Sequence, residues 1–272
     1  MEKVSVTRNS RMIEFGDGDI KICLPIVGRT KQEIAEQCLK AVSYQPDVIE
    51  FRADWYEALE QQDCLMDVLR QIRDIVNDTI LLFTIRTAKE GGEKDISWEQ
   101  YVAINLAAAQ SGYVDLIDVE AFFNCGAMRL DGMPAAELAE YVDEEVVTLL
   151  SNLQEKQVKV ITSNHDFSKT PSHEHMCARM KSMQKMGTDI AKLAVMPQQP
   201  EDVLELLNAT LEVSKSNQTP VITMSMGAQG MMSRICGTLF GNSMTFACAG
   251  KASAPGQIPI EELRKILLLE NF

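Results

Sequence analysis

Residues 188–197 read TDIAKLAVMP, a short apolar run that ends at a proline. A run of this kind is typical of a buried strand. Lys192 interrupts it, and period-two alternation places this residue on one face with Ile190, Ala194 and Met196. If that face points inward, desolvation lowers the pKa of the lysine below its usual value of about 10.4 and leaves neutral amine to attack a carbonyl. The alternative is a lysine held in a structural ion pair.

Similar strand-like runs extend from this stretch in both directions, with helical patterns between them. Most are almost continuously apolar, as expected for parallel strands that are covered on both faces. The predicted strands are 20–27, 47–52, 80–86, 114–120, 158–163, 189–195, 220–224 and 244–249.

The intervening segments carry helix signals. Thr30–Glu33 and Ser97–Gln100 read as capping boxes, and Thr170-Pro171 as an N-cap followed by a first-turn proline. Apolar positions recur with helical spacing in the other segments. The predicted helices lie near 30–42, 65–76, 138–153, 171–186, 200–214, 229–240 and 259–271, and one more begins at Ser97.

Eight strands, each followed by a helix, predict an α/β protein with a (β/α)8 TIM barrel. We expect residues 1–272 to form a single domain. Residues 1–19 fit no strand–helix unit, and segments 4–7 and 12–15 around Asn9-Ser10 predict a β-hairpin that closes the bottom of the barrel.

Composition excludes several classes of function. The net charge of −13 argues against nucleic acid and anionic membranes as partners. No 18-residue apolar run and no signal-peptide core are present, so we expect a cytoplasmic protein without a membrane span. The seven cysteines are scattered and contain no C-x-x-C pair, which favours reduced thiols.

In a TIM barrel, active-site groups lie at the carboxyl ends of the strands. His165 follows the fifth strand in VITSNHDF, with Asp166 beside it. An imidazole can take and return a proton at neutral pH. The alternative is a histidine that holds a loop by hydrogen bonds.

Two other strands end in charged residues. VIEFRAD places Glu50, Arg52 and Asp54 on one face, and FTIRTAKEGGE places Arg86 at a strand end with Glu90 after it. Buried charges are costly unless they pair with each other or with a ligand. They therefore predict either an internal ring of salt bridges or a polar binding set, and Glu50 with Arg86 could serve as both.

The last part of the chain offers weaker signals. Arg234 could bind a carboxylate bidentately. Segment 250–257, which contains Ser253 and Gln257, reads as a loop or as a mobile lid. Met224 and Met226 are expected in the barrel core or lining a pocket.

One tempting metal motif is rejected. SHEHMC contains His173, His175 and Cys177, but i,i+2 spacing places neighbouring members on different helix faces. We expect no metal site here.

The motifs EFRAD, FTIRTAKEGGE, SNHDF, DIAKLAVMP, TMSM and KASAPGQI, in this order, closely resemble the type I 3-dehydroquinate dehydratase family. The resemblance extends over almost the whole chain, from about residue 20 to 269. It implies dehydration of 3-dehydroquinate to 3-dehydroshikimate through a lysine imine, in the shikimate pathway to chorismate and aromatic amino acids. It also implies a homodimer that needs no metal or organic cofactor.

The same resemblance implies a role for each matching residue. Lys192 corresponds to the imine-forming lysine, His165 to the general acid and base, and Glu90 to the carboxylate that orients the histidine. The implied substrate-binding residues are Glu50, Arg52, Arg86, Arg234, Ser253 and Gln257.

There are two departures from the family pattern. Pro25 stands where some relatives have a substrate-contacting serine, and Phe51 replaces a common tryptophan. The first puts one polar contact with the substrate in doubt.

Two other functions remain as alternatives. A lysine-imine aldolase or transaldolase would cleave a carbon–carbon bond, but we find no glycine-rich phosphate cup after the seventh or eighth strand. A non-catalytic carboxylate-binding barrel would keep Arg234 and Glu50 but would not need Lys192, His165 and Glu90 together.

Overall fold

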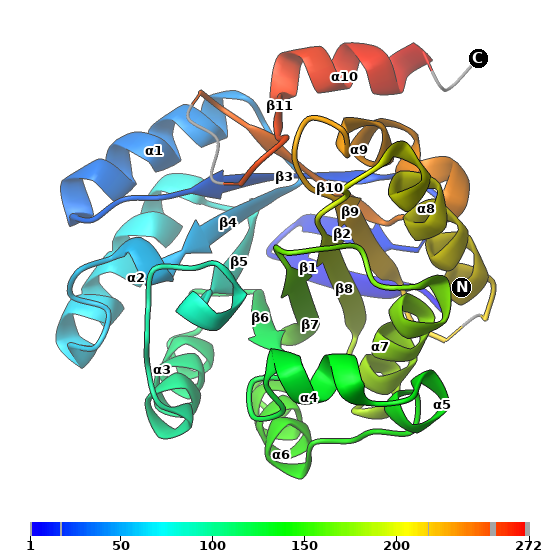
Figure 1. Cartoon of the computed structure of the whole chain (residues 1–272). Helices are drawn as coiled ribbons and strands as arrows, with labels where there is room; N and C mark the ends of the chain where they lie inside the picture. The colour runs from blue at the N-terminus through cyan, green and yellow to red at the C-terminus, as the bar shows by residue number, and fades with distance from the viewer. Residues whose placement is uncertain (1, 17, 217, 251–253, 270–272) are drawn as a thin grey trace.

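The computed structural model describes residues 2–16, 18–216, 218–250 and 254–269. Within them, parallel strands β3 to β10 lie side by side in chain order and are surrounded by helices (Figure 1). The sheet closes where the Ser243 backbone N–H donates to the Val221 carbonyl at 2.9 Å, beside a parallel bridge between Val221 and Asn242. The predicted α/β barrel is confirmed. Its strands are β3 (Lys21–Ile26), β4 (Val48–Arg52), β5 (Ile80–Thr84), β6 (Leu116–Glu120), β7 (Lys159–Asp166), β8 (Ile190–Val195), β9 (Val221–Ser225) and β10 (Met244–Cys248), with the short β11 (Ile258–Pro259) beside β10.

Helices follow the strands and cover the outside of the barrel. Among the described residues, none of them combines the length and the apolar character needed to span a membrane. The α-helices are α1 (Lys31–Ser43), α2 (Gln62–Val76), α3 (Trp98–Gln110), α4 (Ala127–Gly132), α5 (Ala135–Leu138), α6 (Glu144–Gln154), α7 (His173–Lys185), α8 (Pro200–Lys215), α9 (Met231–Cys236) and α10 (Ile260–Leu269).

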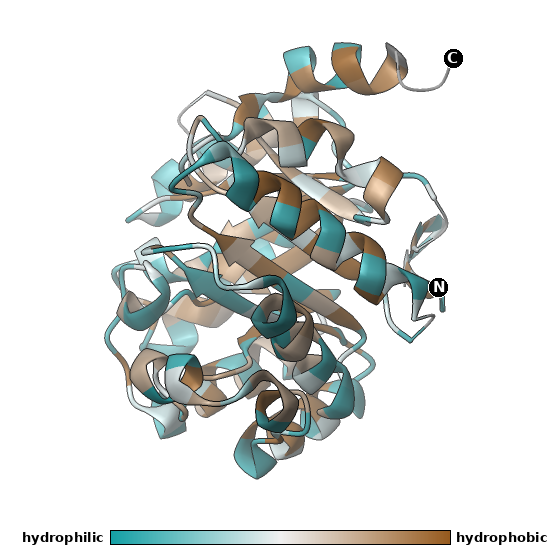
Figure 2. Cartoon of the chain, turned by 45° about the vertical axis from the view of Figure 1, so that its right-hand side comes forward, coloured by the Kyte–Doolittle hydropathy of each residue, from teal (hydrophilic) through white to brown (hydrophobic). Residues whose placement is uncertain are grey.

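Side-chain alternation along the strands divides the core into two layers. In β8, Ala191, Leu193 and Val195 pack outward against the helices, whereas Ile190 and Ala194 belong to a smaller cluster inside the barrel. Figure 2 shows the result: apolar strands fill the centre, and the helices around them alternate apolar and polar residues. The predicted inward face of β8 is therefore correct.

The N-terminal segment forms the predicted hairpin. β1 (Val4–Arg8) pairs antiparallel with β2 (Arg11–Phe15) across a tight turn in which Asn9 has a φ of 51°. Asparagine tolerates this left-handed conformation better than most residues. Phe15 is fully buried and clusters with Val48 and Ile80, which are the first residues of their strands. The hairpin thus covers the amino ends of the strands and leaves the opposite end of the barrel for the pocket.

Several predicted boundaries were wrong. The helix expected over 138–153 is two helices, because Asp143 caps α6 by accepting the backbone N–H groups of Glu145 and Val146. α7 is capped by Ser172 rather than Thr170, and the segment after α9 is a 3-10 turn from Gly237 to Phe240.

Of the two predicted capping boxes, only one is complete. Ser97 and Gln100 each accept the other's backbone N–H. Thr30 accepts from Glu33, but the Glu33 carboxylate accepts from the backbone N–H of Arg29 instead of that of Thr30.

Candidate active site

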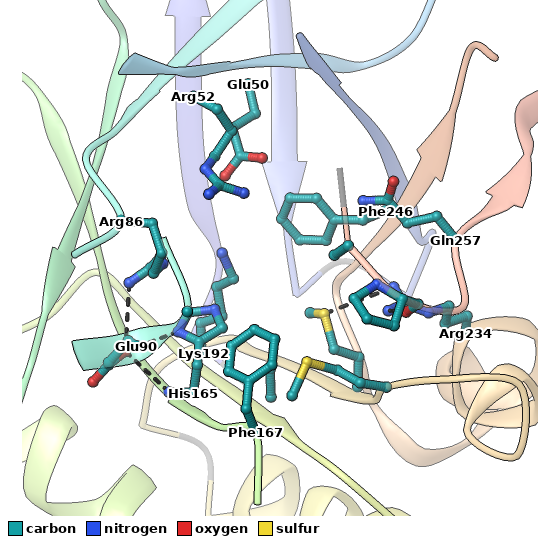
Figure 3. Close-up of a pocket in the computed structure, with 16 residues that line it drawn as sticks. Glu50, Arg52, Arg86, Glu90, His165, Phe167, Lys192, Arg234, Phe246 and Gln257 are labelled. Atoms are coloured by element: carbon teal, nitrogen blue, oxygen red, sulfur yellow. Dashed lines mark hydrogen bonds and ion pairs between the residues drawn. The ribbon is translucent and has the colours of Figure 1, made fainter. Parts of the chain in front are cut away.

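A pocket opens at the carboxyl ends of the strands, where a TIM barrel carries its active site. It holds about 670 Å³ of space not filled by atoms, part of which is open solvent. Figure 3 shows charged side chains around it, with His165 and Glu90 on one side and Arg234 on the other. The lining residues are Glu50, Arg52, Arg86, Glu90, Gly91, His165, Phe167, Lys192, Ala194, Met224, Met226, Arg234, Phe246, Ala254, Pro255 and Gln257.

Lys192 lies in the middle of β8, and its side chain enters the pocket from inside the barrel. The residue is 3% exposed. Its Nζ lies 2.9 Å from Asp118 Oδ2 and 4.6 Å from the centre of the Phe246 ring. The amine therefore has one anionic partner and one aromatic face.

Asp118 lies in β6 and was not identified from the sequence. Its Oδ1 accepts hydrogen bonds from Arg86 at 2.7 Å and from the Ser163 hydroxyl at 2.6 Å, while its Oδ2 faces Lys192. Burial opposes its negative charge, but Arg86 and Lys192 hold the pKa of Asp118 below its ordinary value. The strand sequence LIDVE carried the same signal as VIEFRAD, namely acidic residues within an apolar run.

Among the described residues, the guanidinium of Arg86 contacts carboxylates and one hydroxyl, that of Ser163. Besides Asp118, its guanidinium lies 3.1 Å from Glu120 and 3.5 Å from Glu90. Burial works against the cation, but these carboxylates raise the pKa of Arg86 well above its ordinary value. The expected ring of salt bridges is present on this side of the barrel.

The structure does not contain the expected ion pair between Glu50 and Arg86. Glu50 instead accepts a hydrogen bond from the Thr84 hydroxyl at 2.9 Å. Arg52 forms a two-pronged salt bridge with Asp54, with both contacts at 2.8 Å. Arg86 turns to the opposite neighbour, β6, because Asp118 and Glu120 supply two buried charges there.

His165 and Glu90 form a hydrogen-bonded pair at the pocket wall. β7 runs to Asp166, three residues beyond the predicted end, so His165 belongs to the strand rather than to the following loop. Its Nδ1 lies 2.9 Å from Glu90 Oε2, which also accepts the backbone N–H of His165. The Asn164 amide donates to the other oxygen of Glu90 at 2.9 Å. Ring and backbone of His165 are thus fixed by one carboxylate.

Burial disfavours charge on both members of this pair. It lowers the pKa of His165 well below 6.5, and the positive charges of Arg86 and Lys192 act in the same direction. Burial and the Glu120 carboxylate raise the pKa of Glu90, against the opposing effect of Arg86. The imidazole is therefore neutral near pH 7 and available to accept a proton.

Two glycines explain how the loop after β5 brings Glu90 into place. Gly91 has a φ of +78°, and a Cβ there would lie 2.4 Å from the Phe167 ring. A Cβ on Gly92 would lie 1.9 Å from the Arg86 carbonyl oxygen. Only glycine permits this tight return of the chain against Arg86 and Phe167.

Arg234 lies on the opposite side of the pocket, in α9. Although it is 1% exposed, no carboxylate of the described residues lies within ion-pair distance of it. Its hydrogen bonds go to the Pro255 carbonyl at 3.2 Å and the Met224 sulfur at 3.8 Å, and its Nε has no partner in the part of the chain that the structure describes. Burial lowers the pKa of Arg234 to about 10. A buried cation of this kind is suited to an anionic ligand.

The predicted 250–257 lid is described only in part. Pro255 and Gln257 line the pocket, and the Pro255 carbonyl accepts the backbone N–H of Gly227 at 3.3 Å. Ser253 lies outside the described residues.

Apolar side chains complete the wall, including the two methionines placed there by sequence reasoning. Met224 and Met226 line the pocket, as do Phe167 and Phe246, which the sequence did not single out. Phe51 faces away, packing against Phe83 at 6.0 Å between ring centres, so its departure from the family pattern lies outside the pocket.

The arrangement combines a buried amine, a neutral imidazole and a buried guanidinium that meets no carboxylate of the described residues, all around one cavity. Such a set can form a covalent adduct with a carbonyl, move a proton next to it and hold an anionic group at a distance. Among the described residues, one group of side chains could hold a metal ion, His173, Cys177 and Glu212, and none of them lines this pocket.

Comparison with known proteins identifies the family of this chain. The model of the type I 3-dehydroquinase family matches residues 22–271. The 3-dehydroquinate dehydratase of Clostridium kluyveri is 43% identical over 260 residues, covering 95% of each chain. That of Listeria welshimeri is 40% identical over 267 residues, covering 98% of this chain and 97% of the relative.

Solved structures give the same result. The 3-dehydroquinate dehydratase of Geobacillus kaustophilus superposes with a TM-score of 0.89 at 34% identity, covering 100% of this chain and 97% of that one. The type I enzyme of Clostridium difficile, solved with covalently modified comenic acid, gives a TM-score of 0.87 at 41% identity, covering 99% and 98%. The chain belongs to the type I 3-dehydroquinase family.

Proposed function

We propose that this protein dehydrates 3-dehydroquinate to 3-dehydroshikimate through an imine on Lys192. The observation that carries the proposal is the position of the Lys192 amine, buried in a pocket that His165 and Arg234 also line. Family membership supplies the substrate, because the relatives from C. kluyveri and L. welshimeri are 3-dehydroquinate dehydratases.

The covalent step begins at the amine. The Lys192 amine attacks the ketone of the substrate, and loss of water gives an iminium that withdraws electrons from the adjacent carbon. His165 then removes the acidified proton from that carbon. The resulting enamine expels the ring hydroxyl, to which His165 returns the proton, so one molecule of water leaves. Hydrolysis of the imine releases the product and restores the amine.

Glu90 serves this sequence by holding His165. Its Oε2 contacts both Nδ1 and the backbone N–H of the histidine, which leaves Nε2 as the nitrogen that exchanges the proton. The tautomer with hydrogen on Nδ1 donates to Glu90 and presents a basic Nε2.

Arg234 is proposed to bind the substrate carboxylate. The net charge of −13 opposes an anionic substrate at long range, so the local cations must dominate at short range. Among the cations that line the pocket, Arg234 is the one that forms no ion pair with a carboxylate of the described residues. Binding the substrate carboxylate there would also fix the orientation of the substrate ring.

The ring hydroxyls of the substrate are proposed to bind to the remaining polar side chains of the pocket. Glu50 and Arg52 line the pocket from β4, and Gln257 approaches from the loop before β11. Arg86 already forms salt bridges with Asp118 and Glu120. We therefore expect it to support the shape of the site rather than to bind the substrate directly. Ser253 is retained as a proposed substrate contact from the sequence alone.

Further parts of the proposal rest on family membership. We expect a single-domain cytoplasmic enzyme that works as a homodimer without a metal or organic cofactor in catalysis, in the shikimate pathway. Analytical ultracentrifugation of the purified chain tests the dimer.

A turnover assay tests the activity. The product contains a carbonyl conjugated with a ring double bond, so its formation from 3-dehydroquinate is followed by near-ultraviolet absorbance. The proposal expects this absorbance to rise with wild type and not with Lys192→Ala. A ring-opened isomer of 3-dehydroquinate, formed by cleavage of a carbon–carbon bond, would instead indicate an aldolase.

A further inference from the structure

Two neighbouring helices bring together side chains that the catalytic proposal does not use. His173 begins α7, Cys177 lies one turn later on the same face, and Glu212 approaches from α8. We propose that these three residues form a zinc-binding site on the outside of the barrel. The sequence argument against a metal site in SHEHMC applies to His175, which is not part of this group. His173 and Cys177 lie one helical turn apart, and the third ligand is Glu212, which is distant in sequence.

The spacing of the three ligand atoms fits a tetrahedral ion. His173 Nε2 lies 2.9 Å from Glu212 Oε2 and 3.7 Å from Cys177 Sγ, and all three atoms lie within 4.8 Å of one another. Zinc bonds of about 2.0–2.3 Å place neighbouring tetrahedral ligands about 3.3–3.8 Å apart. The His173–Glu212 contact is shorter than this range, and the Glu212 side chain is 50% exposed, so it can shift its position to accommodate an ion.

The surroundings favour the metal-binding form of the histidine. Binding through Nε2 requires the hydrogen on Nδ1, and Nδ1 lies 3.7 Å from Glu205 Oε2 on the same face of α8. This distance is longer than a hydrogen bond, but the exposed Glu205 side chain can move closer, and a carboxylate bonded to Nδ1 would fix the ring and strengthen the nitrogen ligand. Lys181 contacts Glu212 Oε1 at 3.0 Å and therefore leaves Oε2 for the ion.

The chemistry of the ligands selects the metal. A thiolate, an imidazole and a carboxylate suit zinc better than magnesium or calcium, which prefer oxygen ligands alone. Binding replaces the proton of the Cys177 thiol with the ion, and because His173 and Glu212 are partly exposed, water can take the fourth position.

Such an ion would join two helices that flank the strand of Lys192. α7 precedes β8 and α8 follows it, and the two helices lie next to each other on the right of the barrel in Figure 1. None of the three ligands lines the pocket, so the site is predicted to add stability rather than to take part in turnover.

The alternative to a metal site is an ion pair between His173 and Glu212, with the Cys177 thiol packed beside it. Titration with cobalt(II) distinguishes a metal site from such an ion pair. Titration of the full chain with Co²⁺ is expected to give a near-ultraviolet thiolate-to-cobalt band that saturates at one equivalent and is abolished by added Zn²⁺. Zn²⁺ should also raise the Tm, because it binds only the folded state.

Variants with matched controls show which residues bind the cobalt ion that gives the thiolate-to-cobalt band. Cys177→Ala should abolish it and His173→Ala should weaken binding at least tenfold, whereas Cys64→Ser and His175→Ala should leave it unchanged. Glu205→Gln should weaken binding by about 10–100-fold, as expected for a residue that orients a ligand. His173→Ala and Glu212→Gln alter partly exposed positions, so they test the site even if Cys177→Ala does not fold. A band absent from wild type, or undiminished in His173→Ala, would overturn the proposal.

Discussion

The side-chain amine of Lys192 lies 2.9 Å from Asp118 Oδ2 inside the barrel. Asp118 is itself fixed by Arg86 and Ser163, so the amine is held by a carboxylate that has little freedom to move. This contact orients Lys192, and it also requires the amine to leave its anionic partner before it attacks a ketone.

Asp118→Asn is therefore expected to slow imine formation. The amide keeps the shape of the side chain but positions the amine less firmly, and a small misplacement of a reacting group can cost about 10²-fold in rate. Single-turnover kinetics with 3-dehydroquinate measures the effect. Ser163→Ala removes one support of Asp118 and should show a smaller loss in the same step; equal rates in wild type and both variants would remove Asp118 from this role.

His165→Ala is expected to separate proton transfer from covalent chemistry. Turnover should fall by about 10²–10⁴-fold, because a positioned acid–base group contributes that much. Imine formation should persist, since the amine does not depend on the imidazole for nucleophilicity. Steady-state rates combined with mass spectrometry of trapped adducts report both quantities. His175→Ala is the matched control, and a turnover loss of the same size in that variant would point to a general effect on folding.

The titration of His165 should reflect its burial. Because burial, Arg86 and Lys192 all disfavour the imidazolium, its midpoint should lie below 6.5, so the ring stays neutral as the pH falls from about 8 to 6.5. The unfolded chain takes up this proton earlier, so His165 should also make the protein less stable as the pH falls below 6.5. NMR of the three histidines, with His165→Gln for assignment, measures the midpoint; a value above 6.5 would contradict this account.

Glu90→Gln should change that titration. The amide still fills the space but can no longer offer two carboxylate oxygens to the His165 ring, its backbone N–H and Asn164. The NMR midpoint and the turnover rate should both differ from wild type. If neither moves, Glu90 does not orient the histidine.

Arg234→Ala should mainly weaken substrate binding. A hydrogen bond to a charged group contributes about 1.5–3 kcal/mol, which corresponds to a rise in KM of about 10–100-fold. An analogue whose carboxylate is replaced by a carboxamide should bind equally poorly to wild type and variant. An unchanged KM for 3-dehydroquinate would place the carboxylate elsewhere.

The sequence predicted most of the barrel because its strands are almost continuously apolar runs, and side-chain alternation along β8 correctly placed Lys192 inside. Boundaries failed where a local cap outweighed periodicity, as Asp143 does before α6. Asp118 was overlooked although it interrupts an apolar strand as visibly as Glu50 does. The choice between Glu50 and Asp118 as partner of Arg86 depends on which neighbouring strand the guanidinium faces, and this is a property of three-dimensional packing.

The most direct test of the central claim is borohydride reduction of the protein during incubation with 3-dehydroquinate, followed by intact-mass measurement and peptide mapping. The account predicts a single reduced substrate adduct on Lys192, present in His165→Ala and absent from Lys192→Ala. Continued dehydration by wild type without any adduct on Lys192 would contradict the covalent mechanism.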